Sequence, residues 1–293
     1  MAATLIDGKA IAAGIRAEIA RAVADQIAAG GERPGLGVLL VGDNPASLSY
    51  VTGKEKACSE AGMRSIEHRL PAIASTEDVL QVIAEMNADA RIHGVLVQLP
   101  LPGPVDENRV IDAIAPEKDV DGFTAGNVGR MMLGRPCFLP CTPNAILRLL
   151  DHSGIETDGR HVVVVGRSNI VGKPIAQLLA RKRPGPNATV TMCHTGTRDL
   201  GAFTRQADIL VVATGRPRTI TADMVKPGAA VIDVGVNRIP NPTKKAGFHL
   251  EGDVDFAAVK EVAGWITPVP GGVGPMTITM LLLNTLEAAR RTS

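Results

Sequence analysis

Residues 161–174 read HVVVVGRSNIVGKP, and this stretch decides the class of fold. Residues 161–165 form a largely apolar run of strand length, and a turn with two glycines follows before a helical pattern over 171–181. A helix that starts directly after a parallel strand points backbone N–H groups at the end of that strand, which suits a pyrophosphate. The glycine spacing departs from GxGxxG, because Ser168 stands at the second glycine position and Gly172 comes one residue late. An ordinary strand–helix turn that needs a glycine is the alternative.

The same alternation of strand and helix continues on both sides of this stretch. The predicted strands are residues 36–41, 64–70, 94–98, 161–165, 189–193, 209–213, 230–234 and 265–267. The predicted helices are residues 7–29, a helix from Pro45 past Cys58, and residues 75–90, 106–115, 143–150, 171–181, 199–207, 221–225 and 274–291. Buried aliphatic strands that alternate with helices predict parallel sheets covered on both faces, an α/β fold. A Pro- and Gly-rich stretch over 116–143 separates two such halves.

Composition bounds the class of protein. The chain has 293 residues, 45% of them hydrophobic, which favours two domains with sizeable cores and excludes a wholly disordered chain. A formal charge of +1 and only 2% aromatic residues argue against a nucleic-acid partner. The longest apolar runs fall far short of the ~18 residues of a membrane-spanning helix, and the N-terminus lacks a signal-peptide pattern. Four scattered cysteines have neither zinc-site nor disulfide-scaffold spacing, so we expect no metal, reduced thiols and a cytoplasmic location.

The region after the strand at 189–193 bears on the choice of dinucleotide. NAD sites place an acidic residue there to hold the ribose 2′-hydroxyl, but no carboxylate occurs before Asp199. Arg167 in the glycine loop offers a guanidinium, which pairs with phosphate oxygens in a fixed fork. These residues predict NADP rather than NAD, with a solvated surface arginine as the alternative for Arg167.

A second group of polar residues lies in the first half of the chain. Tyr50, the only tyrosine, and Lys54 are four residues apart on a predicted helix and therefore share one face. Gln98 ends the third predicted strand, at the edge of the sheet where ligands bind in such folds. Asp119 and Asp121 follow in the connector between the halves. Each residue alone has an ordinary explanation, such as helix surface or turn capping, but together they predict a small-molecule site.

Several longer motifs occur in order along the chain. They are YVTGK (50–54), GVLVQLPLP (94–102), DVDGF (119–123), PCTP (140–143), the 166–174 loop, DVGVNR (233–238) and TPVPGGVGPMT (267–277). Together they resemble the bifunctional methylenetetrahydrofolate dehydrogenase/methenyltetrahydrofolate cyclohydrolase family, and the match covers essentially the full length. The resemblance implies two reactions. Methylene-tetrahydrofolate gives a hydride to NADP, and water then opens the methenyl ring to give 10-formyl-tetrahydrofolate.

The resemblance also implies roles for individual residues. Lys54 matches the catalytic lysine, and Tyr50 and Gln98 match the neighbours that position it. Asp121 matches the aspartate that binds the pterin end of the folate. The residues implied to line the folate site further are Val97, Leu99, Pro270, Gly271, Gly272, Val273 and Gly274. Those implied to contact the cofactor are Gly166, Arg167, Ser168, Thr195 and Val236.

The domain arrangement and the assembly are expected as follows. Residues 1–140, together with a C-terminal helix over 274–293 that returns to them, form a folate-binding catalytic domain. Residues 141–273 form a Rossmann-like NADP-binding domain. The resemblance further implies a homodimer through the cofactor domain.

The chemistry fits a lysine at the centre of the site. The hydride leaves a carbon between two nitrogens, so the substrate itself stabilises the cation and the protein mainly holds the reactants in place. Hydrolysis needs a proton acceptor for water and a proton donor for a ring nitrogen, and a lysine serves only if burial or a nearby cation lowers its pKa. Two alternatives stay open: another NADP-linked dehydrogenase that acts on a small acid, and a non-catalytic cofactor-binding sensor.

Overall fold

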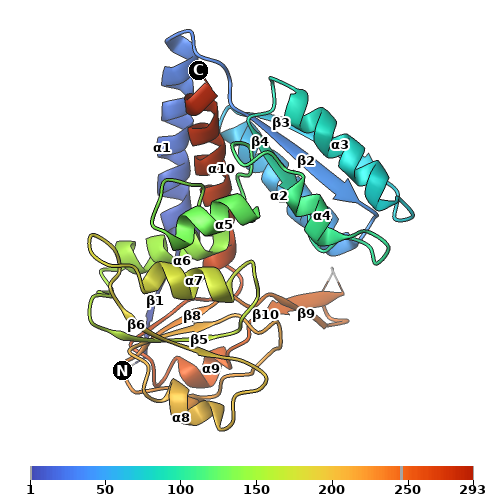
Figure 1. Cartoon of the computed structure of the whole chain (residues 1–293). Coiled ribbons are helices and arrows are strands. Elements are labelled where there is room, and N and C mark those ends of the chain that lie inside the picture. Colours follow the sequence, from blue (N-terminus) through green and yellow to red (C-terminus); the bar gives the residue numbers. More distant parts are fainter. Residues whose placement is uncertain (1, 245–246, 293) are drawn as a thin grey trace. The chain divides into compact units, whose positions relative to one another are not determined.

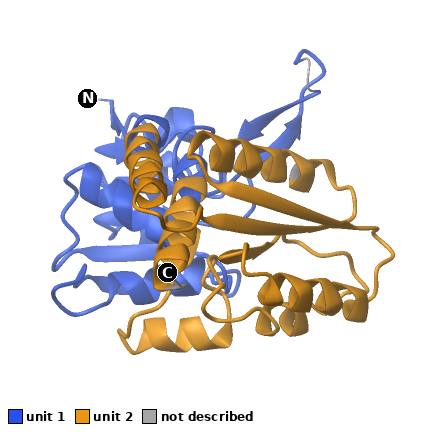
Figure 2. Ribbon diagram, turned by 90° about the horizontal axis from the view of Figure 1, so that it is seen from above, with its two compact units in different colours: residues 1–12, 142–277 blue, residues 13–141, 278–293 orange. Residues whose placement is uncertain are grey.

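The computed structural model describes residues 2–244 and 247–292. Figure 1 shows helices and strands in alternation along the chain, and Figure 2 colours the two compact units into which it divides. Unit 1 comprises residues 1–12 and 142–277, and unit 2 comprises residues 13–141 and 278–293. All three boundaries between the units fall within helices, namely α1 (Gly8–Ala28), the first turn of α6 (Cys141–His152) and α10 (Val273–Thr292).

Unit 1 is built on a six-stranded sheet of order β1-β11-β8-β7-β5-β6, in which every neighbouring pair is parallel. Its strands are β1 (Thr4–Leu5), β5 (His161–Val165), β6 (Thr189–Cys193), β7 (Ile209–Val212), β8 (Ala230–Asp233) and β11 (Trp265–Ile266). The chain runs from β5 to β6 on one side and returns to β7 on the other, so the topological switch point lies between β5 and β7. Strands β5, β7 and β8 are almost entirely buried, which explains their continuous apolar runs.

Helices cover both faces of this sheet. They are α6 (Cys141–His152), α7 (Gly172–Leu179), α8 (Leu200–Thr204) and α9 (Phe256–Val259), with a 3₁₀ turn at Ala222–Met224. Figure 1 places α6 and α7 on one face and α8 and α9 on the other. Side chains of β5, β7 and β8, among them Val163, Leu210 and Val231, pack in one core cluster beside Leu200 of α8 and Phe256 of α9. The predicted Rossmann-like, doubly wound α/β fold is confirmed.

Unit 2 contains a three-stranded parallel sheet of order β3-β2-β4. Its strands are β2 (Gly35–Val41), β3 (Arg64–Leu70) and β4 (Gly94–Val97), and the helices beside α1 and α10 are α2 (Pro45–Glu60), α3 (Thr76–Ala88), α4 (Glu107–Asp112) and α5 (Ala125–Met132). The central strand β2 is buried throughout, and its register pairs Leu39 with Val97. Because the strands are parallel, the segments after β2 and β4 leave the sheet at the same edge.

Three predicted helix starts are confirmed by their hydrogen bonds. Asp7 Oδ1 accepts the N–H of Ala10 at 2.9 Å at the start of α1. Ser75 and Asp78 form a reciprocal capping box before α3, and the carboxylate of Asp106 caps α4. Among the described residues, none of the helices combines the length and the apolar character that spanning a membrane requires.

The structure also contains elements that the sequence pattern did not predict. β1 pairs with β11 in the sheet of unit 1, although the sequence analysis grouped residues 1–140 together. α5 lies inside the Pro- and Gly-rich connector, and β9 (Asn237–Pro240) and β10 (Phe248–Glu251) form an antiparallel hairpin. The predicted helix at 221–225 is only the 3₁₀ turn. The paired strands among these elements are too short for a period to show, so tertiary pairing rather than pattern determines them.

Candidate active site

Lys54 and Gln98 form the centre of the candidate site in unit 2. Lys54 lies on α2, and Gln98 directly follows β4. The Nζ of Lys54 donates a hydrogen bond of 3.0 Å to Gln98 Oε1, and Gln98 Nε2 donates to the Leu99 carbonyl at 2.7 Å. The backbone N–H of Gln98 donates to the Leu39 carbonyl of β2 at 2.9 Å, which anchors the residue to the sheet. Both side chains are half-buried, and the sheet thereby fixes the direction in which the ammonium points.

Burial and a carboxylate together set the protonation of Lys54. Removal from water disfavours the ammonium and lowers the pKa of Lys54, while the charge of Asp121 opposes this shift. For Asp121 the signs are reversed, because burial raises its pKa and the positive charge of Lys54 lowers it again. A lysine in this setting releases its proton more readily than an exposed one, as acid–base chemistry near neutral pH requires.

The two aspartates of the DVDGF motif have different surroundings. Asp119 is fully buried, and its Oδ1 accepts the N–H of Phe123 at 3.1 Å. Its Oδ2 accepts the N–H and the hydroxyl of Thr124 at 2.8 and 2.7 Å and the amide of Asn127 at 2.8 Å. These bonds close the turn that leads into α5. Asp119 is therefore a structural residue, and of the pair only Asp121 acts electrostatically on Lys54.

Two cysteines, whose spacing predicts only reduced thiols, act on Lys54. Cys58 follows Lys54 by one turn of α2, and burial raises its pKa to about 12. Cys141 begins α6, and its buried thiol donates to the Val120 carbonyl at 3.3 Å and hydrogen-bonds with Asp121. Burial and the adjacent carboxylate raise the pKa of Cys141 well above its usual value. Both thiols stay neutral, so they shape the surroundings of the ammonium without adding a charge.

The remaining residues predicted for this part of the site flank its centre. Tyr50 precedes Lys54 by one turn of α2, and its side chain is 42% exposed. Val97 and Leu99, on either side of Gln98, pack in the core cluster of unit 2. Folate contacts of these three residues stay predictions.

The glycine loop of unit 1 connects β5 to α7 at the switch point. Gly166 has a φ of +128°, and a Cβ there would lie 2.2 Å from the carbonyl oxygen of Ala213. A Cβ at Gly172 would lie 2.2 Å from the carbonyl oxygen of Gly166. Both positions exclude a side chain, so the strand, the turn and the helix start pack backbone against backbone. This tight turn fits the close approach of a dinucleotide pyrophosphate.

Ser168 acts within this loop. Its Oγ accepts the N–H groups of Val171 at 3.2 Å and Gly172 at 3.3 Å, and its carbonyl accepts that of Lys173 at 3.1 Å. Two of the N–H groups that the sequence pattern assigned to a pyrophosphate are therefore already engaged in the turn. The side chain of Arg167 is exposed beside them.

The loop after β6 was predicted to lie near the adenosine ribose. Thr195 is exposed there, and the turn around it is closed by the His194 N–H, which donates to Thr197 Oγ1 at 2.9 Å. Asp199, the first carboxylate after the strand, accepts the N–H of Ala202 at 3.1 Å and caps α8. The first acidic residue after β6 is thus used as a helix cap.

The predicted folate loop before α10 and Val236 also belong to unit 1. Gly271 has a φ of +112°, and its carbonyl accepts the N–H of Lys9 at 2.9 Å. A Cβ at Gly8 would lie 1.9 Å from the Gly272 carbonyl oxygen, so this loop packs tightly on the start of α1. Val236 lies in the loop after β8 and is 42% exposed. Ligand contacts of these residues stay predictions.

Two buried aspartates that the sequence analysis did not single out tie together the loops after β7 and β8. Asp233 accepts the N–H groups of Gly235 and Asp253, each at 2.9 Å. Asp253 in turn accepts those of Thr214 and Gly215 at 2.6 and 2.8 Å. Burial raises the pKa of Asp233 to about 7, although its N–H partners favour the charged form. The network rigidifies the edge of the sheet that carries the glycine loop.

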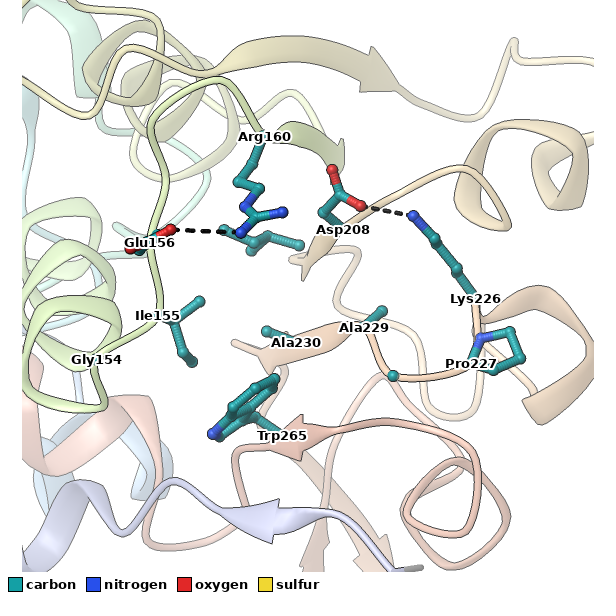
Figure 3. A pocket seen from close by; sticks show the side chains of 12 residues that line it. Gly154, Ile155, Glu156, Arg160, Asp208, Lys226, Pro227, Ala229, Ala230 and Trp265 are labelled. Carbon is teal, nitrogen blue, oxygen red and sulfur yellow. Dashed lines mark hydrogen bonds and ion pairs between the residues drawn. The ribbon is translucent and has the colours of Figure 1, made fainter.

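A cavity of about 330 Å³ opens at the other edge of this sheet, where β7, β8 and β11 begin (Figure 3). Arg160 pairs with Glu156 at 3.4 Å and Lys226 pairs with Asp208 at 2.6 Å, while Trp265 forms part of the wall. Ligands of doubly wound sheets bind at the carboxyl ends of the strands. This cavity lies at the amino ends of the strands, opposite the edge where such sheets bind their ligands.

A doubly wound sheet with a close-packed glycine turn at its switch point places the chain among the dinucleotide-binding α/β proteins. Residues 140–293 match the NAD(P)-binding domain of the tetrahydrofolate dehydrogenase/cyclohydrolase family, and residues 6–121 match its catalytic domain. The chain belongs to the tetrahydrofolate dehydrogenase/cyclohydrolase family. The resemblance seen in the motifs is thereby confirmed.

Individual relatives cover nearly the whole chain. The bifunctional protein FolD of Geobacillus thermodenitrificans (strain NG80-2) is 59% identical over 291 residues, 99% of each chain. The crystal structure of the bifunctional FolD methylenetetrahydrofolate dehydrogenase/cyclohydrolase of Campylobacter jejuni has 44% identity and a TM-score of 0.93, and 100% of both chains is covered. The Trypanosoma brucei methylenetetrahydrofolate dehydrogenase-cyclohydrolase (FolD), solved with NADP and an inhibitor, has 40% identity and a TM-score of 0.95, covering 100% of this chain and 99% of that one.

Proposed function

We propose that this chain oxidises 5,10-methylene-tetrahydrofolate to 5,10-methenyl-tetrahydrofolate with NADP and then hydrolyses this product to 10-formyl-tetrahydrofolate. Membership of the family and the full-length similarity to bifunctional relatives support both activities. The observation that carries the proposal is the half-buried Lys54 ammonium, which Gln98 Oε1 holds at 3.0 Å and the charge of Asp121 stabilises. A cofactor-binding sensor has no use for such a group.

In the first reaction the protein must position the reactants and need not act as an acid or a base. The hydride leaves a carbon between two nitrogens, and the resulting cation is stabilised by the substrate itself. NADP, when bound, supplies the hydride acceptor. In this reaction unit 1 holds the dinucleotide at the close-packed turn that contains Gly166 and Gly172. The Asp233–Asp253 network keeps the neighbouring loops in place.

The second reaction needs a proton acceptor and then a proton donor. Water attacks the methenyl carbon, a C–O bond forms, and the neutral amine of Lys54 takes the proton that the water loses. The ring C–N bond then breaks as the hydroxyl of the adduct loses its proton to solvent and becomes the formyl C=O, and the Lys54 ammonium returns a proton to the leaving nitrogen. Gln98 Oε1 orients the Nζ through both steps, because it accepts a hydrogen bond from either protonation state. In this scheme Asp121 binds the pterin, and its charge keeps the pKa of Lys54 from falling further.

The experiment that tests this proposal measures the two reactions separately in Lys54→Met. We expect hydrolysis to fall by roughly 10²–10⁴, the usual contribution of a positioned acid–base group, with NADP binding unchanged. Lys56→Met is the matched control, because Lys56 is 77% exposed and pairs with Glu60 at 3.8 Å on another face of the helix. Full cyclohydrolase activity in Lys54→Met would remove Lys54 from the mechanism. Failure of the unmodified chain to form NADPH from methylene-tetrahydrofolate would favour the alternatives.

We also infer that NADP is preferred over NAD through Arg167. The side chain of Arg167 is exposed in the glycine loop, where it can reach a phosphate. Asp199, the first carboxylate after β6, follows the strand by six residues and caps α8 through its Oδ1. Both observations support recognition of a 2′-phosphate by a guanidinium.

A homodimer through unit 1 is the assembly that we propose. In the described part of the chain, β6 pairs with β5 and forms one edge of the six-stranded sheet. Such an edge presents unpaired N–H and C=O groups to a second strand. Light scattering should give a mass near twice 30.6 kDa, and a monomer at assay concentrations would overturn the assignment. The four cysteines are free thiols, which supports a reducing compartment, and we propose the cytoplasm.

A further inference from the structure

The C-terminal helix α10 carries a buried carboxamide that faces the segment containing Asp121. The side chain of Asn284 is 7% exposed. Its Nδ2 donates to the Val120 carbonyl at 2.8 Å and to the Leu139 carbonyl at 3.1 Å. An asparagine is a poor residue for a helix interior, and a buried amide is tolerated only where its hydrogen bonds are made. Asn284 meets this condition by bonding to backbone outside its own helix.

These two carbonyls belong to two separate segments, one that leads to Asp121 and one that leads to Cys141. Val120 immediately precedes Asp121, and Leu139 lies two residues before Cys141. The Val120 carbonyl also accepts the Cys141 thiol at 3.3 Å, so it is held from two sides. The two segments pack backbone against backbone: a Cβ at Gly122 would lie only 2.8 Å from the Phe138 carbonyl oxygen.

A side-chain amide is suited to link the Val120 and Leu139 carbonyls. One NH₂ group carries two N–H donors, and here they reach two carbonyls on separate segments. A hydroxyl has a single donor, and an aliphatic side chain has none. Asn284 thus cross-links residues 120 and 139, and the direction of the peptide between Val120 and Asp121 follows from this bond.

We propose that Asn284 is a positioning residue of the folate site, which acts by holding the Asp121 carboxylate toward Lys54. The inference rests on the proposed function, and it assigns the C-terminal helix a part in the site. Three groups act electrostatically on Lys54, namely Asp121, Cys141 and Cys58, and of these the carboxylate of Asp121 does most to raise the pKa of Lys54. Displacement of Asp121 therefore removes the charge that raises the pKa of Lys54.

The test compares Asn284→Leu with Thr285→Val, which is the matched control. Thr285 is the next residue of α10 and is fully buried, but its hydroxyl donates to the Leu281 carbonyl within the helix at 2.8 Å. In Asn284→Leu we expect KM for the folate to rise about tenfold and the rising limb of the cyclohydrolase pH profile to move to lower pH. KM for NADP should stay unchanged. Thr285→Val should alter none of these quantities by more than about twofold.

A second variant and a double-mutant cycle keep the proposal falsifiable. Asn284→Ser keeps one donor and should show the same changes at smaller size. In an Asp121→Ala background the effect of Asn284→Ser on folate KM should vanish, because the group that it positions is gone. An unchanged folate KM in folded Asn284 variants, an equal effect in the Asp121→Ala background, or loss of folding in Asn284→Ser would each overturn the proposal. Absence of both activities in the unmodified chain would instead refute the proposed function.

Discussion

Replacement of Gln98 should move the pH dependence of hydrolysis in a direction set by the new side chain. Gln98→Leu keeps a similar volume but removes the oxygen that accepts from the Lys54 Nζ at 3.0 Å. Gln98→Glu keeps the oxygen and adds a negative charge at the same place. Loss of the acceptor destabilises the ammonium relative to the amine, whereas a carboxylate stabilises the ammonium. The two substitutions should therefore shift the pKa of Lys54 in opposite directions.

The size of the shift follows from the bond that is lost. A hydrogen bond to a charged group contributes roughly 1.5–3 kcal/mol, and about 1.4 kcal/mol corresponds to one pH unit. Gln98→Leu should move the rising limb of the profile to lower pH by roughly one to two units. Gln98→Glu should move it to higher pH by roughly one to three units, the usual effect of an opposite charge in contact. In both variants the maximal rate should fall, because the Gln98 amide no longer orients the Lys54 amine.

The assay is the pH dependence of kcat for hydrolysis of the methenyl substrate. The profile of kcat reports the enzyme–substrate complex, so weaker folate binding does not distort the comparison. Hydride transfer, measured on the same preparations, should keep its pH dependence. Shifts of the same sign in both variants, or no shift in either, would refute the assignment of Lys54 as the titrating group.

Three further predictions concern unit 1 and the glycines. Arg167→Ala should raise KM for NADP at least about tenfold and change KM for NAD by less than about twofold, and equal losses would end the 2′-phosphate assignment. Gly166→Ala puts a Cβ 2.2 Å from the Ala213 carbonyl oxygen and should cost more than about 2 kcal/mol of unfolding free energy, whereas Gly14→Ala, with no atom within 4 Å of its Cβ, should be neutral or stabilising in the same urea titration. The pKa of Asp233 is raised to about 7, so the native state holds this proton more tightly than the unfolded chain does. Stability should therefore fall as pH rises from about 4 to 7, by at most about 1.4 kcal/mol per unit, and Asp233→Asn should lack this component. Parallel unfolding free energies for Asp233→Asn and the unmodified chain across this range would contradict the last prediction.

Local patterns in the sequence predicted most of the regular structure. The capping residues Ser75 and Asp106 mark helix starts by bonds to residues two or three positions away, so the pattern and the structure agree there. The buried strands of both sheets show as apolar runs for the same reason, since burial on both faces selects the composition directly. Lys54 was singled out by its spacing from Tyr50 on a predicted helix and Gln98 by its position at the end of a strand, and the structure brings Lys54 and Gln98 into contact.

Other features of the site and the fold could not be predicted, because they depend on contacts between residues that are distant in the sequence. The DVDGF motif offered two aspartates, and only the tertiary structure showed that Asp119 closes a turn while Asp121 interacts with the lysine. Cys141 stands in the PCTP motif, but only the tertiary structure showed that its thiol meets the Val120 carbonyl. The two-residue strand β1 was invisible, because its pairing with β11 supplies the order that its own length cannot.

The sequence alone therefore determined the class of fold, the glycine turn and the residue types available for acid–base chemistry, because each is written in neighbouring positions. The tertiary structure decided which of those residues act together. Lys54 and Gln98 are 44 residues apart, and Asn284 and Val120 are 164 apart. Contacts over such separations follow no period of 2.0 or 3.6 residues, and they exist only once the sheets and the C-terminal helix have packed.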